Sequence, residues 1–175
     1  MKSIFLFMLA ISTACLGQTS VETTKSQLTI DPYIKSVNNL TLEGALELSK
    51  RATMTATLLD KKVAIALLDA SGTTILITRG DGVGPHNTEA ARRKAYTALS
   101  TKTPTLLLLR NAIANADTKN LNTLPELLLL GGGVPIWFKG TIIGSVGVAG
   151  GGSPENDDAI AKSVSIPEIG IMTTK

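Results

Sequence analysis

The feature that most constrains the fold is a pair of short apolar runs joined by a tight turn. VAIALLD (63–69) and TTILITR (73–79) flank the turn Asp69-Ala70-Ser71-Gly72. A second pair, VPIWF (134–138) and TIIGSVGVAG (141–150), is joined by Lys139-Gly140. Such runs around glycine turns are typical of β-hairpins, and strands joined by tight turns run antiparallel. The sequence therefore predicts an antiparallel sheet.

Helix signals lie between and around these hairpins. Thr41 is a predicted N-cap for a helix over 42–58, which Lys61 and Lys62 follow. Asn87 or Thr88 is expected to cap a helix that runs to about residue 102. Further helices are predicted to begin at Pro104 and, with Ser153 as the cap, at Pro154, whereas 115–123 is expected to be a polar loop. The predicted fold class is α+β, an α/β sandwich in which helices cover a central antiparallel sheet of about five strands.

Composition narrows the class of protein. The chain has 175 residues, with 43% hydrophobic and 18% charged, as expected for a globular chain with one core. Aromatic residues are only 3%, and the formal net charge is +3. Single-strand binders need aromatic stacking platforms, and duplex binders need a strong basic surface. We therefore expect no nucleic-acid partner.

The first residues, MKSIFLFMLAISTACLGQ, have the pattern of a secretory signal peptide: Lys2, a short apolar run, then small residues. We expect a signal peptide over 1–17, a polar N-terminal tether over 18–40 and one domain over 41–175. The protein is then exported, periplasmic or extracellular, and no other segment has the character of a transmembrane helix. The alternative is a lipid anchor at Cys15, the only cysteine.

The only histidine, His86, lies in VGPHNTEAARRKAY (83–96), after a glycine-rich loop. A lone histidine is often structural, but loop positions beside glycine and proline are favoured places for binding residues. One histidine cannot build a multi-histidine zinc site, whereas it can be the single axial ligand of a haem. Glu89 lies close enough in sequence to share an ion with His86 if the helix begins early.

A basic triplet, Arg92, Arg93 and Lys94, follows on the same predicted helix. It can be a solvated helix face. It can also bind carboxylates, because guanidinium groups form two parallel hydrogen bonds with them. The carboxylates would belong to haem propionates or to a small organic acid.

Glycines recur at every third position in the last long strand, including Gly144 and Gly147. Glycine inside a strand marks close approach by another backbone or by a ligand, so helix packing and a ligand pocket are both open. In GGGSPENDD (150–158), acidic residues crowd the start of the next helix. They favour a turn and a capped helix over a phosphate site.

Catalytic motifs are lacking. There is no GxSxG motif and no serine near His86. The spacing of Asp69, Asp81 and Glu89 does not indicate a catalytic pair of carboxylates. The sequence assigns no catalytic residue, and it favours a binding protein over an enzyme.

Three segments together resemble a known family: VAIALLDASGTTILITRGDG, PHNTEAARRKAYTALSTKTPT and GGGVPIWFKGTIIGSVGVAGGGSPENDDAIAKS. They are similar to the GlcG/HbpS-like family of extracellular haem-binding and haem-degrading-type proteins, which is related to the C-terminal domain of PduO adenosyltransferases. The resemblance covers about residues 40–170. It implies a profilin-like fold, homo-oligomers of up to eight copies and, in some members, binding of haem or another tetrapyrrole.

Three hypotheses follow. In the first, the protein is a secreted haem-binding protein for scavenging, sensing or degradation, with His86 as the iron ligand and Arg92 or Arg93 at a propionate. Its apolar walls come from Leu106–Leu109 or from the Gly144–Gly150 strand. In the second, it is an enzyme or sensor for a small organic acid at the same residues. In the third, it is an oligomeric structural or interaction module without a ligand.

Overall fold

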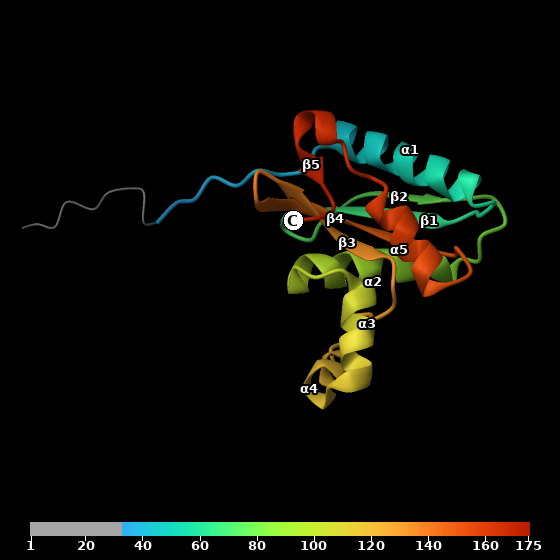
Figure 1. Ribbon diagram of the computed structural model, residues 1–175. Helices are drawn as coiled ribbons and strands as arrows, with labels where there is room; N and C mark the ends of the chain where they lie inside the picture. The colour runs from blue at the N-terminus through green and yellow to red at the C-terminus, as the bar shows by residue number, and fades with distance from the viewer. Residues whose placement is uncertain (1–32) are drawn as a thin grey trace, which may run out of the picture. The chain divides into compact units, whose positions relative to one another are not determined.

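A computed structural model describes residues 33–175, of which residues 36–175 form one compact unit (Figure 1). Its five strands form one antiparallel sheet in the order β2-β1-β4-β3-β5. The predicted signal peptide and residues 18–32 of the predicted tether lie outside the described residues. In chain order the elements are α1 (Leu42–Leu58), β1 (Ala64–Asp69), β2 (Thr74–Arg79), α2 (His86–Thr101), α3 (Thr105–Ala114), α4 (Ala116–Lys119), the 3-10 helix η1 (Asn120–Thr123), β3 (Gly133–Phe138), β4 (Thr141–Ala149), α5 (Pro154–Lys162), the 3-10 helix η2 (Pro167–Ile169) and β5 (Ile171–Met172).

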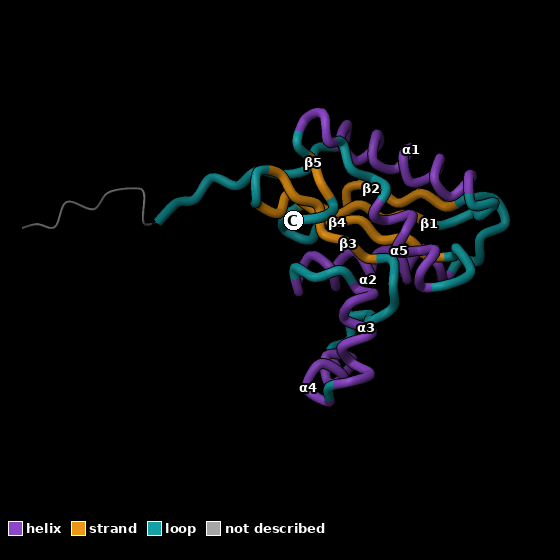
Figure 2. Tube along the Cα trace, viewed as in Figure 1, coloured by secondary structure: helices purple, strands orange, loops and turns teal. Residues whose placement is uncertain are grey.

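The helices lie on both faces of the sheet (Figure 2). Helices α1 and α5 cover one face, and α2 covers the other. The predicted α+β fold with a five-stranded antiparallel sheet is confirmed. Within residues 33–175 there is no helix long and apolar enough to cross a membrane.

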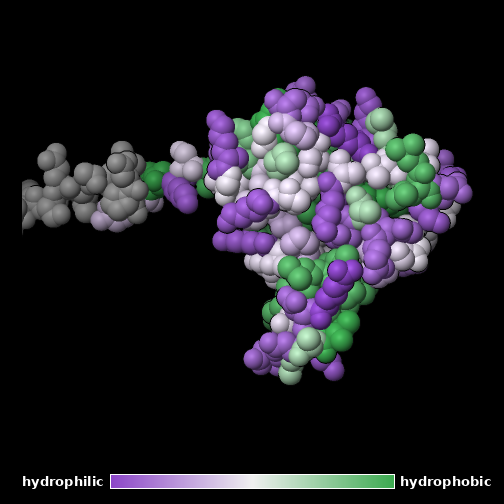
Figure 3. Space-filling model, viewed as in Figure 1, coloured by the Kyte–Doolittle hydropathy of each residue, from purple (hydrophilic) through white to green (hydrophobic). Residues whose placement is uncertain are grey.

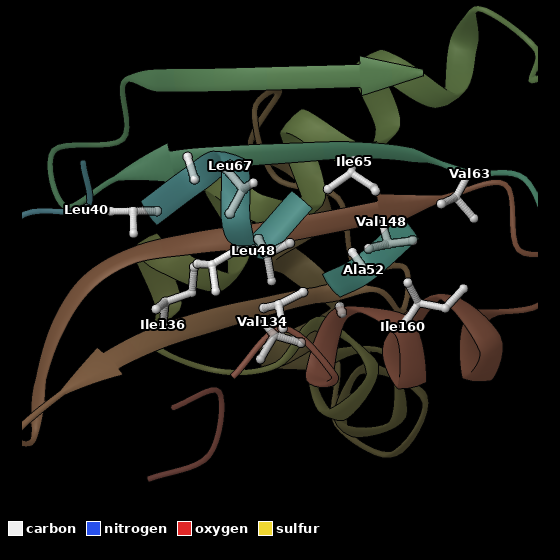
Figure 4. Packing of buried hydrophobic residues seen from close by; sticks show 14 of the residues in the cluster. Leu40, Leu48, Ala52, Val63, Ile65, Leu67, Val134, Ile136, Val148 and Ile160 are labelled. Carbon is white, nitrogen blue, oxygen red and sulfur yellow. The ribbon is translucent and has the colours of Figure 1, made fainter. Parts of the chain in front are cut away.

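The main core lies between the sheet and the α1/α5 layer (Figure 4). It is built from aliphatic side chains, because the chain has few aromatic ones. Leu48 of α1 and Ile160 of α5 are fully buried against side chains of the sheet. The strand residues that they meet include Ile65, Leu67, Val134, Ile136, Val146 and Val148.

The α2 face is packed differently, with a thin side-chain layer made mostly of alanines. A Cβ added to Gly147 of β4 would lie 1.9 Å from the carbonyl oxygen of Ala91 in α2. One added to Gly133 of β3 would lie 2.1 Å from the carbonyl oxygen of Lys94. The helix backbone therefore rests directly on the backbone of two strands, which accounts for the glycine at each position.

The start of α5 forms as predicted. Ser153 is the N-cap, its hydroxyl accepts a hydrogen bond from the Asn156 amide at 3.1 Å, and Pro154 is the first helical residue. The Asp157 carboxylate accepts a hydrogen bond from the Gly151 amide at 2.7 Å. The anion at this helix start is thus the chain's own carboxylate, in agreement with a capped helix and not a phosphate site.

Two expectations about local structure are wrong. Helix α2 begins at His86 after Pro85, which makes no side-chain cap, and not after Asn87 or Thr88. Proline fixes a helical φ, so the helix can begin earlier than a side-chain cap would place it. Residues 115–123 are not a simple loop, because Asn115 caps α4 through the Asp117 amide and η1 follows.

Helices α3 and α4 project from the sandwich as a lobe (Figure 1), and apolar residues gather on it (Figure 3). Leu107 and Ile113 of α3 are 49% and 81% exposed, and Leu124 and Leu130 beyond η1 are also exposed. Exposed apolar patches of this kind are a feature of surfaces that contact proteins, membranes or ligands. We call these four residues the apolar lobe.

Candidate functional site

His86 is exposed at the first position of α2. Its ring lies over Gly84, where an added Cβ would be 2.9 Å from the imidazole Cε1. No hydrogen bond joins the imidazole to another residue of the described chain. The imidazole is therefore not tied up by the described chain, and a neutral imidazole nitrogen is a good ligand for iron.

Two clefts adjoin the loop that carries His86. The nearer one, of about 280 Å³, is lined by Lys62, Asp81, Gly82, Val83, Gly84, Asn87 and Gly150. The second, of about 320 Å³, is lined by Thr53, Ala56, Thr57, Lys61, Lys62, Val63, Thr78, Arg79, Gly80 and Asp81. They share the lining residues Lys62 and Asp81 and therefore adjoin each other, and we call the two clefts together the basic groove.

Arg92 and Glu89 are paired with each other. Arg92 Nε lies 2.9 Å from Glu89 Oε2, and Arg92 Nη2 lies 2.7 Å from Glu89 Oε1. The same Nη2 also reaches Glu126 Oε2 at 2.8 Å. The hydrogen bonds from Arg92 hold the pKa of Glu89 below its ordinary value. Although α2 begins early, the Glu89 carboxylate is paired with Arg92 and not with His86 in the described chain.

The basic triplet is divided between two environments. Arg93 donates through Nη2 to the Leu127 carbonyl oxygen at 2.8 Å. Lys94 is 4% exposed, and its Nζ lies 2.8 Å from Asp157 Oδ2 and 3.0 Å from the Val148 carbonyl oxygen. The expectation that Lys94 contacts a ligand is corrected, because its charge is neutralised inside the fold, where it joins α2 to α5.

The two glycines are also not brought to His86. Gly147 lies under α2, as described above. A Cβ on Gly144 would lie 2.4 Å from the Leu68 carbonyl oxygen and 3.3 Å from Leu40 Cβ, on the α1 face. Protein atoms occupy both spaces, so the ligand-pocket interpretation of Gly144 and Gly147 is replaced by close packing.

The leucines that were predicted to form apolar walls for a haem on His86 do not line the clefts near His86. Leu106–Leu109 lie in α3, beyond the C-terminal end of α2, whereas His86 is its first residue. Thr105, the residue before Leu106, packs with Lys94 around Gly133, so the start of α3 lies beside the middle of α2 and about two helical turns from His86. None of these leucines lines either of the two clefts near His86.

A larger cleft, of about 610 Å³, lies near the start of α1 and β5. Apolar residues line it, among them Phe138, Ile143 and Ile171. Its one cation, Arg51, lies 2.8 Å from Glu47 and 2.8 Å from Glu168. Because that charge is already neutralised and no histidine lines the cleft, it suits a tetrapyrrole with two carboxylates less well than the His86 region does.

Known proteins resemble the chain over most of its length. The model of the family described as haem degrading protein HbpS-like matches residues 40–165. The corrinoid adenosyltransferase PduO of Citrobacter freundii is 31% identical over 137 residues, which are 77% of this chain. Those residues are 40% of that relative, so the chain spans about two fifths of its length.

Solved structures agree. The crystal structure of HbpS is 34% identical, has a TM-score of 0.70, and is matched over 76% of this chain and 92% of HbpS. The crystal structure of a PduOC:heme complex is 28% identical with a TM-score of 0.67, over 78% of this chain and 99% of that one. With a family model that matches 126 consecutive positions, residues 40–165, this chain belongs to the haem degrading protein HbpS-like family.

Proposed function

We propose that this protein binds haem, with His86 as the single axial ligand of the iron. The observation that carries the proposal is an exposed imidazole, without a hydrogen-bond partner in the described chain, beside Gly84, which lines the basic groove. Support also comes from the family and from a relative whose structure is a haem complex. When bound, haem would supply redox or oxygen chemistry, and the protein would hold and orient it.

The surroundings of His86 fit the iron and the carboxylates of haem but not its apolar faces. The groove is lined mainly by charged, glycine and hydroxyl residues. The exposed apolar lobe, with Leu107 and Ile113 on α3, offers the surface that is missing. We therefore propose a homo-oligomer in which the apolar lobe of one copy covers the haem held by another copy. We also propose that the protein is exported and that it scavenges, senses or degrades haem.

A haem titration tests the iron ligand. Replacing His86 with alanine is expected to abolish the saturable Soret shift seen with the parent, because no other histidine is present. Lys50→Gln, an exposed change on α1 outside the groove, is the control and should bind within about threefold of the parent. Equal binding by His86→Ala and the parent would refute His86 as the ligand.

A charged residue in the apolar lobe tests whether the lobe of one copy covers the haem bound by another. Ile113→Lys should fold normally, because the Ile113 side chain is 81% exposed. A lysine at an apolar contact must lose its water, so the assembly should dissociate and haem affinity should fall by about tenfold or more. Light scattering and the Soret titration measure the two effects, with Lys119→Gln in α4 as a surface control. A variant that loses assembly but keeps full haem affinity would show that one chain is sufficient.

A further inference from the structure

Three cations line the basic groove without an ion-pair partner. Lys61 and Lys62 follow α1, and Arg79 is the last residue of β2. Within residues 33–175, none of the three lies within ion-pair distance of a carboxylate. By contrast, Arg92 and Lys94 are both satisfied by carboxylates of the chain.

The sheet holds these cations at one end of the molecule. Arg79 is paired with Ala64 across the β1/β2 ladder, two residues after Lys62. Gly80 then donates its amide to the Val63 carbonyl oxygen at 3.0 Å, which fixes the turn after Arg79 against the start of β1. The pairing of β1 with β2 therefore brings Arg79 close to Lys61 and Lys62, although Arg79 is distant from them in the sequence.

The groove has a positive charge that the chain does not balance. Asp81 is the one carboxylate that lines it, so three cations and one anion leave a net charge of +2 at neutral pH. Cations near the C-terminal end of α1 are favourable to its dipole, but that effect is small and does not need three of them. Like charges held in one groove repel each other, and a bound anion would remove the repulsion.

We infer that the basic groove binds the two carboxylates of a dianionic ligand, with Lys61, Lys62 and Arg79 as the binding cations. The carboxylates have two possible sources: the propionates of haem held at His86, which rests on the function proposed above, or a free dicarboxylic acid. The position of His86 beside the basic groove favours the propionates of haem as the source. Gly84 lines the cleft that Lys62 also lines, and the His86 ring lies against Gly84, so His86 and Lys62 border the same part of the surface.

Binding assays with three probes separate these sources: haem, haem dimethyl ester and succinate. The variants are Arg79→Gln and Lys62→Gln, with Lys50→Gln on the exposed side of α1 as the control. If propionates are bound, each groove variant should weaken haem by about tenfold, and haem dimethyl ester should bind parent and variants equally. If a free diacid is bound, succinate should raise the melting temperature of the parent and not of the variants.

Asp81→Asn gives a test of opposite sign. It removes the one anion of the groove, so the affinity for the bound carboxylate ligand should rise by about threefold or more, and less at high salt. The inference is overturned if neither haem nor succinate distinguishes the groove variants from Lys50→Gln. Failure of haem to bind the parent would refute the proposed function alone, because the succinate measurement tests the groove without haem.

Discussion

Replacing Gly147 with alanine is expected to lower the free energy of unfolding by about 3 kcal/mol or more, measured by urea denaturation. The added methyl group would lie 1.9 Å from the Ala91 carbonyl oxygen, far inside van der Waals contact. The obstacle is backbone within a helix, which cannot rotate away as a side chain can. Helix α2 would have to move off the sheet and lose packing along its length.

Gly44→Ala is the matched control for this substitution. Its Cβ would meet the flexible end of Leu40 at 3.0 Å and the Thr41 hydroxyl at an ordinary contact distance of 3.5 Å, inside a helix where alanine is preferred over glycine. We expect it to lie within about 1 kcal/mol of the parent. If Gly147→Ala were as stable as Gly44→Ala, the direct contact between α2 and β4 would be disproved.

Replacing Lys94 with methionine is expected to cost about 3–5 kcal/mol, because it leaves the Asp157 carboxylate buried without its cation. Thermal and urea denaturation measure the loss. The control is Arg110→Met, which breaks the Arg110–Glu155 contact of 3.9 Å between two side chains that are each 63% exposed. Exposed pairs contribute about 1 kcal/mol or less, so this variant should be close to the parent.

A double-mutant cycle tests the same pair more directly. Asp157→Asn keeps an oxygen for the Gly151 amide and removes the charge that Lys94 neutralises. In combination with Lys94→Met, the losses should be less than additive by about 1–3 kcal/mol. Strict additivity would mean that the two charges do not interact and that Lys94 stabilises the fold by packing alone.

The fold was predictable because its signals are local. The turn around Gly72, the cap at Ser153 and the helix over 42–58 each depend on residues close in sequence, and the structure has all three. The errors occur where a local signal competes with another. Pro85 set the start of α2 before Asn87, and a short capped helix formed at Asn115 in a segment that polarity alone assigned to a loop.

The site was less predictable because it depends on contacts between distant segments. The sequence places Lys94 beside Arg92 and Arg93, but only the position of α5 shows that Lys94 faces Asp157, which is 63 residues away. The pair Lys61-Lys62 is visible in the sequence as the end of a helix. Its meeting with Arg79 depends on the register of the first hairpin, which a hydrophobic pattern does not specify.

The close seating of α2 on the sheet has a consequence for binding. Because backbone lies on backbone at Gly133 and Gly147, and mostly alanines fill the rest of the interface, this helix has little room to tilt or slide on the sheet. His86, the first residue of α2, is therefore held by a rigid helix in the protein without ligand. The entropic cost of ordering the helix is met during folding, so a ligand has to immobilise only itself and the side chains that it touches.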